Sequence, residues 1–198
     1  MIRLFPNAGG WLEVVCGPMF SGKSEELIRR LRRAEIAGQR VLIVKPKLDS
    51  RYDIGHVVSH AGATMRAVAV ESPADIPGLV ADYDVIGVDE VQFFAPEILL
   101  ILDGLVEQGM RVIVSGLDQD FRGLPFGPMP ELLCRAELID KLQAVCHRCA
   151  GPATMTQRLV DGDPAPADGA TIVVGAIEQY EARCRSCHEL AAPAFATG

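Results

Sequence analysis

Apolar runs with little polar alternation recur through residues 12–118 of the chain. Met65–Val70 is the weakest of them, and the clear ones are Leu12–Gly17, Val41–Pro46, Asp84–Glu90 and Arg111–Asp118. Strands of this composition are usually covered on both faces, which is typical of a parallel sheet. The pattern therefore predicts a mostly parallel sheet.

Segments with helical periodicity separate these runs. The first covers Ser24–Gly38, in which Gly38 has the position of a C′ residue that ends a helix. Ser72–Tyr83 begins with residue types that suit the N-cap, N1 and N3 positions, and Pro96–Gln108 is followed by a closing glycine. Because strands alternate with helices, we expect an α/β fold with helices flanking the sheet.

The character of the chain changes after Leu138. Two Cys-x-x-Cys pairs follow, and between them lies the Pro-, Gly- and Asp-rich stretch DGDPAPADGA, which is unsuited to regular structure. We predict two domains, residues 1–140 and residues 141–198. In the second domain we expect the tail after His188 to be disordered.

The composition excludes several classes of protein. Hydrophobic residues make up 49% of the 198 positions and the formal net charge is −7, so a large nucleic-acid surface is not expected. No apolar run is long enough to span a bilayer, and the first residues lack the features of a secretory signal. We therefore expect a cytoplasmic protein without nucleic-acid or membrane partners.

A phosphate-binding motif lies between the first strand and the first helix. The stretch GPMFSGKS fits G-x-x-x-x-G-K-[ST], and its residues are Gly17, Pro18, Met19, Phe20, Ser21, Gly22, Lys23 and Ser24. Glycines let backbone N–H groups surround a phosphate, and the helix N-terminus adds positive potential. We expect Lys23 to reach the β- and γ-phosphates of a nucleotide and Ser24 to bind Mg²⁺.

Two acidic residues end the third clear strand. Asp89 suits the role of holding Mg²⁺, whereas Glu90 fits either of two roles. In an ATPase it would orient a water molecule, and in a kinase it would accept a proton from a substrate hydroxyl. We assign the next two residues, Val91 and Gln92, to the nucleotide site as well.

Four cysteines predict a metal site. Cys146 and Cys149 form one pair and Cys184 and Cys187 the other, and four thiolates suit a tetrahedral Zn²⁺ ion. Iron can also occupy a four-cysteine site. The 34 residues between the pairs exceed the spacing of a zinc ribbon and predict a loop held at its base by the metal. Cys16 and Cys134 are expected to be buried apolar residues.

Taken together, these motifs resemble the type II thymidine kinases, which contain zinc and form tetramers. The resemblance extends from Trp11 to His188 and rests on GPMFSGKSEELIRR, KPKLDSRY, VDEVQFF, GLDQDFRGLPFGP, VVGAIEQYEARCRSCH and the paired Cys-x-x-Cys motifs. It implies a P-loop NTPase-like domain followed by a small zinc domain whose lasso loop closes over thymine. It also implies ATP and thymidine as substrates, Mg²⁺ with the ATP, structural Zn²⁺, a homotetramer and feedback inhibition by dTTP.

The same resemblance implies roles for individual residues. Glu90 matches the catalytic base at the 5′-hydroxyl, and Arg51 matches an arginine near that hydroxyl and the phosphates. Phe121 matches a ring that stacks on the base. The other residues of the expected thymidine pocket are Met19, Phe93, Leu117, Phe126, Thr156, Val173, Val174, Gly175 and Tyr180. The chain departs from the usual family pattern at Ala176, where a second glycine is common, and at Leu124, where a charged residue is common.

Other classes of protein explain less of the sequence. A nucleic-acid-stimulated ATPase with a zinc ribbon would use the arginines of Arg29–Arg33, although an acidic, short chain does not favour a motor. A GTPase would carry an N-K-x-D motif, which is absent from the sequence. A zinc-binding module without catalysis would leave the phosphate loop and Asp89-Glu90 unexplained.

Overall fold

The computed structural model describes residues 9–47, 56–58, 62–168 and 179–191. At its centre is a six-stranded sheet with the order β5-β2-β6-β7-β1-β8, in which all neighbouring strands are parallel. The strands are β1 (Trp11–Cys16), β2 (Val41–Pro46), β5 (Val68–Val70), β6 (Val85–Val88), β7 (Arg111–Gly116) and β8 (Leu138–Lys141). This arrangement confirms the predicted mostly parallel α/β fold.

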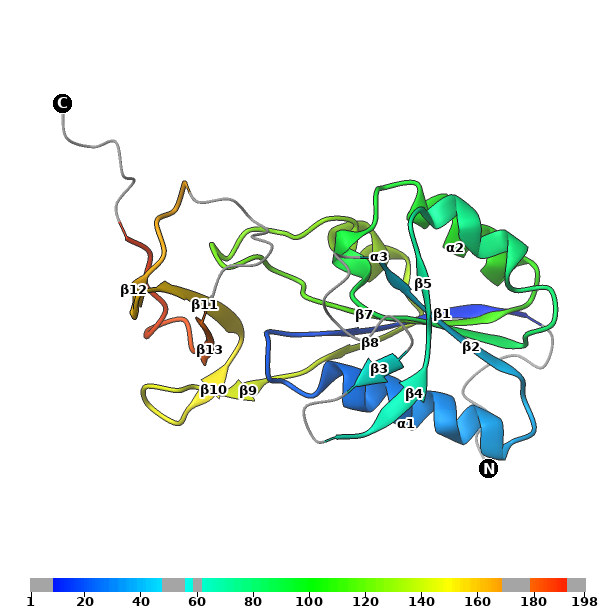
Figure 1. Cartoon of the computed structure of the whole chain (residues 1–198), viewed down its shortest axis with the longest axis horizontal. Coiled ribbons are helices and arrows are strands. Elements are labelled where there is room, and N and C mark those ends of the chain that lie inside the picture. Colours follow the sequence, from blue (N-terminus) through cyan, green and yellow to red (C-terminus); the bar gives the residue numbers. More distant parts are fainter. Residues whose placement is uncertain (1–8, 48–55, 59–61, 169–178, 192–198) are drawn as a thin grey trace.

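Helices cover both faces of this sheet (Figure 1). Helix α1 (Lys23–Ile36) lies on one face, and α2 (Ile98–Glu107) and α3 (Met129–Arg135) lie on the other. Successive residues of each strand therefore enter different cores, because side chains alternate between the two faces of a sheet. In β2, for example, Ile43 packs in the core beneath α1, and Leu42 and Val44 pack in the core beneath α2. This double burial explains why the strands lack polar alternation.

Some predicted elements differ in the structure. The segment predicted as a helix over Ser72–Tyr83 contains only a 3₁₀ helix, η1 (Pro73–Gly78), which has the expected capping box and an internal proline that opposes further α-helix. The run Met65–Val70 divides between β4 (Thr64–Arg66), which pairs with β3 (His56–Val58), and β5, which pairs with β2. Helix α2 begins two residues after Pro96.

The described part of the chain after β8 forms small antiparallel sheets beside one end of the α/β body (Figure 1). Strand β9 (Ala144–Val145) pairs with β10 (Pro152–Ala153), and β11 (Met155–Val160) pairs with both β12 (Asp163–Pro164) and β13 (Gln179–Arg183). Strand β8 crosses the predicted boundary at residue 140, since Lys141 pairs with Cys16 of β1. The division into two domains stays a prediction.

Among the described residues, no helix combines the length and apolar character that crossing a membrane requires.

Candidate active site and metal centre

The phosphate loop connects the end of β1 to the start of α1. Gly17 has φ 139° and Gly22 has φ 85°, conformations that residues with a side chain rarely adopt. A Cβ atom added to Gly17 would also lie 2.5 Å from the carbonyl oxygen of Leu142. Glycine is therefore required at this position both by the backbone conformation and by the close approach of the chain after β8.

Three hydrogen bonds hold the peptide between Pro18 and Met19. Its carbonyl oxygen accepts from Lys23 Nζ at 2.7 Å and from Ser21 Oγ at 2.8 Å. Its N–H donates to Thr156 Oγ1 at 3.0 Å. Thr156 belongs to β11, so a residue expected in the thymidine pocket contacts the phosphate loop directly.

Asp89 follows β6 and is buried beside the start of α1. Its carboxylate accepts hydrogen bonds from Ser115 Oγ at 2.5 Å and from Ser24 Oγ at 3.3 Å. Burial raises the pKa of Asp89 above its ordinary value, while these bonds and the charge of Lys23 oppose that shift. The two residues predicted to bind Mg²⁺ thus lie together, and a hydroxyl beside a carboxylate offers the oxygen ligands that this ion prefers.

Glu90 has an unusual backbone conformation, with φ 52°. Such left-handed conformations are uncommon for residues with a side chain and are enriched at functional sites. Its Oε2 accepts a hydrogen bond from Gln92 Nε2 at 2.5 Å, and Gln92 Oε1 accepts from the Leu117 N–H at 3.0 Å. Burial and the neighbouring charge of Asp89 raise the pKa of Glu90. The geometry therefore places a restrained carboxylate next to the phosphate loop.

Burial lowers the pKa of Lys23, and the charges of Glu90 and Asp89 oppose this effect. Lys23 is 8% exposed, and its ammonium group interacts electrostatically with both acids. A buried cation beside two acids keeps its charge more readily than an isolated one. Lys23, Asp89 and Glu90 therefore form one charged group at the carboxyl ends of β1 and β6.

The segments that follow β6 and β7 contribute the aromatic residues of the expected base pocket. The rings of Phe93, in the 3₁₀ helix η2 (Val91–Phe93), and Phe126 meet edge to face with centroids 5.4 Å apart. Phe121 is buried, and the Arg158 guanidinium lies 5.1 Å from its ring centroid. His188 Nε2 lies 2.8 Å from the Phe121 carbonyl oxygen. Arg158 of β11 and His188, which follows the last cysteine, therefore both contact the loop after β7 at Phe121.

The structure describes only part of the expected pocket. Thr156 on β11 and Tyr180 on β13 lie on neighbouring strands, where Tyr180 is in register with Arg158. Leu117 is half-buried, and Leu124, one of the departures from the family pattern, is 51% exposed. The expected residues outside the described ranges are Arg51, Val173, Val174 and Gly175, and the departure Ala176 also lies there.

Two residues of this region were not predicted from the sequence. Ser115 donates to Asp89, and the buried Asp118 carboxylate pairs with Lys141 Nζ at 2.6 Å. Both lie at or just after the carboxyl end of β7. A polar residue at the end of an otherwise apolar strand is the sequence signal that would have identified Ser115, because ligand sites of open α/β sheets gather at that edge.

The four predicted metal ligands form a compact cluster. The sulfur atoms of Cys146, Cys149, Cys184 and Cys187 all lie within 4.8 Å of one another. Although desolvation opposes it, hydrogen bonds from backbone N–H groups of Cys184, Cys149 and their neighbours lower the pKa of Cys146 to about 6. This geometry and the thiol donors fit a tetrahedral Zn²⁺ site.

The remaining two cysteines differ from each other. Cys16 is fully buried at the end of β1, as expected for an apolar core residue, and burial raises its pKa to about 11. Cys134 on α3 is exposed, so the prediction that it is buried was wrong. It occupies the solvent side of a short helix whose buried residues are Met129 and Leu132.

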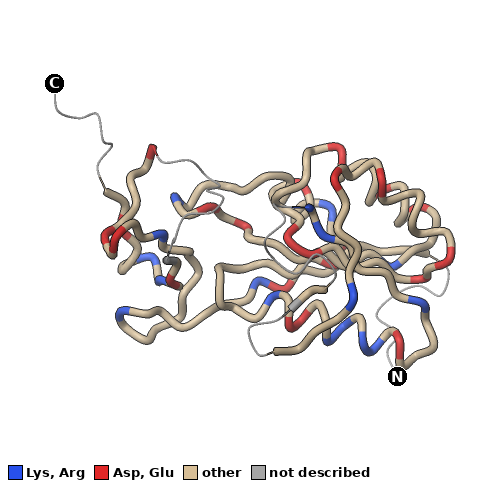
Figure 2. The backbone as a smooth tube through the Cα atoms, viewed as in Figure 1, with Lys and Arg blue, Asp and Glu red and all other residues tan. Residues whose placement is uncertain are grey.

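Basic and acidic positions both occur along α1 (Figure 2). Arg29 and Arg30 both pair with Glu26, at 2.6 and 2.8 Å. Arg30 is buried and also pairs with Glu13 and Asp140. Of the arginines that a nucleic-acid-stimulated ATPase would require on its surface, Arg30 is therefore buried in ion pairs, whereas Arg29 pairs with Glu26 and stays exposed, as do Arg32 and Arg33.

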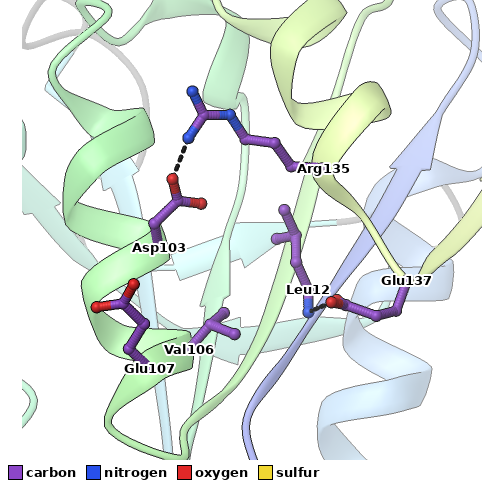
Figure 3. A pocket seen from close by; sticks show the side chains of 6 residues that line it. All are labelled: Leu12, Asp103, Val106, Glu107, Arg135 and Glu137. Atoms are coloured by element: carbon purple, nitrogen blue, oxygen red, sulfur yellow. Dashed lines mark hydrogen bonds and ion pairs between the residues drawn. The ribbon is translucent and has the colours of Figure 1, made fainter.

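A separate cavity of about 220 Å³ lies at the end of β1 opposite the phosphate loop (Figure 3). Arg135 pairs with Asp103 there, and Glu137 accepts a hydrogen bond from the Leu12 N–H at 2.7 Å. The cavity is lined by Leu12, Asp103, Val106, Glu107, Arg135 and Glu137. None of these residues belongs to the charged group around Lys23.

Comparison with protein families identifies the chain. A family model for thymidine kinase matches residues 10–188, which include the phosphate loop, Asp89, Glu90 and all four clustered cysteines. The match confirms the resemblance drawn from the motifs, and the cysteine cluster is compatible with the zinc-containing type II group. The protein belongs to the thymidine kinase family.

Proposed function

We propose that the protein transfers the γ-phosphate of ATP to the 5′-hydroxyl of thymidine, and also to that of deoxyuridine, giving the nucleoside monophosphate and ADP. The grouping of Lys23, Ser24, Asp89 and Glu90 at the carboxyl ends of β1 and β6 is the observation that carries this proposal. It unites the groups needed to bind a nucleoside triphosphate with a carboxylate able to accept a proton.

The chain would hold both substrates in line. Backbone N–H groups of the phosphate loop and the ammonium of Lys23 bind the β- and γ-phosphates, and Val91 and Gln92 border the nucleotide. Ser24 and Asp89 are the residues that would hold Mg²⁺, and the bound ion would neutralise charge on the phosphate oxygens. Glu90 accepts the proton of the 5′-hydroxyl as this oxygen attacks the γ-phosphorus, and ADP leaves. Arg51 would stabilise the charge that develops on the same phosphates during the transfer.

The base would lie between the aromatic residues that follow β6 and β7 and the lasso. Phe93, Phe121 and Phe126 supply flat apolar surfaces, and backbone groups of the lasso at Val173–Gly175 read the edge of the base. The remaining walls are Met19, Leu117, Thr156 and Tyr180. A pocket closed by backbone should accept a pyrimidine and exclude a purine by size. Closure would also exclude water and so prevent ATP hydrolysis.

We extend the proposal to assembly and regulation. The four cysteines would hold a structural Zn²⁺ ion, and the protein would act in the cytoplasm as a homotetramer inhibited by dTTP. These properties follow the resemblance to the type II group. Size-exclusion chromatography with light scattering and a dTTP titration of the activity would test the last two.

The decisive experiment follows ADP release from magnesium ATP while nucleosides are added one at a time. Thymidine and deoxyuridine should stimulate release and yield their monophosphates, whereas deoxyadenosine and deoxyguanosine should not. Glu90→Gln should retain thymidine binding and lose most of kcat. ATP hydrolysis without nucleoside, or stimulation only by single-stranded DNA, would overturn the proposal and favour the nucleic-acid-stimulated ATPase.

A further inference from the structure

We propose that Thr156 is a positioning residue for ATP binding, because its hydroxyl fixes the peptide that holds the ammonium of Lys23. The contact joins the phosphate loop to a strand of the cysteine-containing part of the chain, 137 residues away in sequence. The inference rests on the proposed function, in which the phosphate loop binds ATP. It assigns to Thr156 a role toward the nucleotide that is separate from its expected place near the base.

The geometry of the peptide bond carries the argument. In a trans peptide the N–H and C=O groups point in opposite directions. The Met19 N–H points to Thr156 Oγ1, so the Pro18 carbonyl oxygen must face the other way, where it accepts from Lys23 Nζ at 2.7 Å. The Thr156 hydroxyl thereby determines the direction in which the Pro18 carbonyl oxygen, the acceptor of the Lys23 ammonium, points.

Thr156 is itself held in place. The residue is 3% exposed, and a β-branched side chain has few rotamers available to it. On β11 it is in register with Ala182 of β13, whose carbonyl oxygen accepts from the His147 N–H at 2.9 Å. Ala182 also packs in the small core that contains Cys146. The strand that presents the hydroxyl is therefore attached to the cysteine cluster.

Loss of the hydroxyl should weaken ATP binding even when no nucleoside is present. The Met19 amide would lose its acceptor, and the Pro18–Met19 peptide could then rotate away from Lys23. Because one hydrogen bond between neutral groups is lost, we expect the Kd for ATP to rise about three- to tenfold. A residue that contacted only the thymine base would leave this Kd unchanged.

The test measures binding of a non-hydrolysable ATP analogue with Mg²⁺ to the zinc-loaded protein by calorimetry, without nucleoside. Thr156→Val keeps the shape and removes the hydroxyl, Thr156→Ala removes it without risk of a clash, and Thr156→Ser retains it. We expect the valine and alanine variants to bind about three- to tenfold more weakly and the serine variant to bind as the wild type does. Thr154→Val, the same substitution two residues earlier, is the matched control and should bind normally.

Other outcomes would overturn the inference. Binding by Thr156→Val equal to that of the wild type would show that the hydrogen bond does not affect the nucleotide site. Equal weakening in Thr156→Ser or Thr154→Val would show a general effect on packing instead. Failure of the wild-type protein to bind the analogue would be a different result, because it would contradict the proposed function itself. In steady-state kinetics, the valine variant should raise KM for ATP more than it lowers kcat.

Discussion

Replacing Gln92 with leucine should slow phosphoryl transfer more than it weakens substrate binding. Gln92 is 2% exposed, and its side chain links the Glu90 carboxylate to the backbone at Leu117, since it donates to Glu90 Oε2 and accepts from the Leu117 N–H. Leucine has a similar size but neither a donor nor an acceptor. The carboxylate of Glu90 would then keep its burial and lose the hydrogen bond from Gln92 that restrains it.

The expected magnitude follows from the two hydrogen bonds. A hydrogen bond to a charged group contributes about 1.5–3 kcal/mol, and about 1.4 kcal/mol corresponds to a tenfold change in rate. If this contribution acts mainly in the transition state, kcat should fall about 10- to 100-fold. The Leu117 amide would also lose its acceptor, which costs about 1–3 kcal/mol of folding free energy, partly offset by the buried apolar side chain.

The assay combines steady-state kinetics with urea unfolding. Leu102→Val is the matched control, because Leu102 is fully buried on α2 and a lost methylene costs about 1 kcal/mol. This control should reduce stability and leave kcat unchanged. The reasoning would be refuted by a Gln92→Leu variant whose kcat stays within about twofold of the wild type, or whose loss of activity equals that of the control.

Three further changes test other parts of the structure. Gly127→Ala should lower the free energy of unfolding by about 2–4 kcal/mol, because φ is 51° and the new Cβ would lie 2.2 Å from the Gln92 carbonyl oxygen; an unchanged thermal midpoint would contradict this. Cys149→Ser should reduce bound zinc, measured by elemental analysis, and destabilise the small sheets; full zinc content would argue against the site. Glu26→Gln should lower the free energy of unfolding by about 1–2 kcal/mol near pH 6 and by little near pH 2. The reason is that hydrogen bonds, chiefly from Arg29, lower the pKa of Glu26 from 4.5 to about 2. That stabilisation is complete above the pKa that Glu26 has in the unfolded chain, and it disappears as the pH falls through the pKa in the folded protein. Urea unfolding curves of the wild type and the variant that differ equally at both pH values would therefore disprove the assignment.

The central sheet could be predicted because its strands are buried on both faces and therefore read as continuous apolar runs. Shorter elements could not be separated in this way. The run from Met65 to Val70 forms two strands because each half pairs with a different partner, and those partners lie elsewhere in the chain. The helix predicted after Ser72 was too long, because the local capping signals identify a start and say little about length.

The candidate site shows the same limit. The phosphate loop, Asp89, Glu90 and the four cysteines are local motifs, so their residue types and spacings could be recognised directly. The partners that hold them depend on strand order instead. Ser115 reaches Asp89 only because β6 and β7 are neighbours, and Thr156 reaches Met19 only because β11 lies beside the phosphate loop.

The close approach between Gly17 and Leu142 has a consequence for protein engineering. Only two residues separate β8 from β9, and the first of them, Leu142, donates from its N–H to the Cys16 carbonyl oxygen at 2.8 Å and leaves no room for a side chain at Gly17. This two-residue connection is therefore fixed by its contacts with the phosphate loop, unlike a flexible linker between independent modules. Inserting residues between β8 and β9 would displace the backbone that packs against Gly17 of the phosphate loop, so added residues are better placed in the exposed turn at Asp161–Gly162.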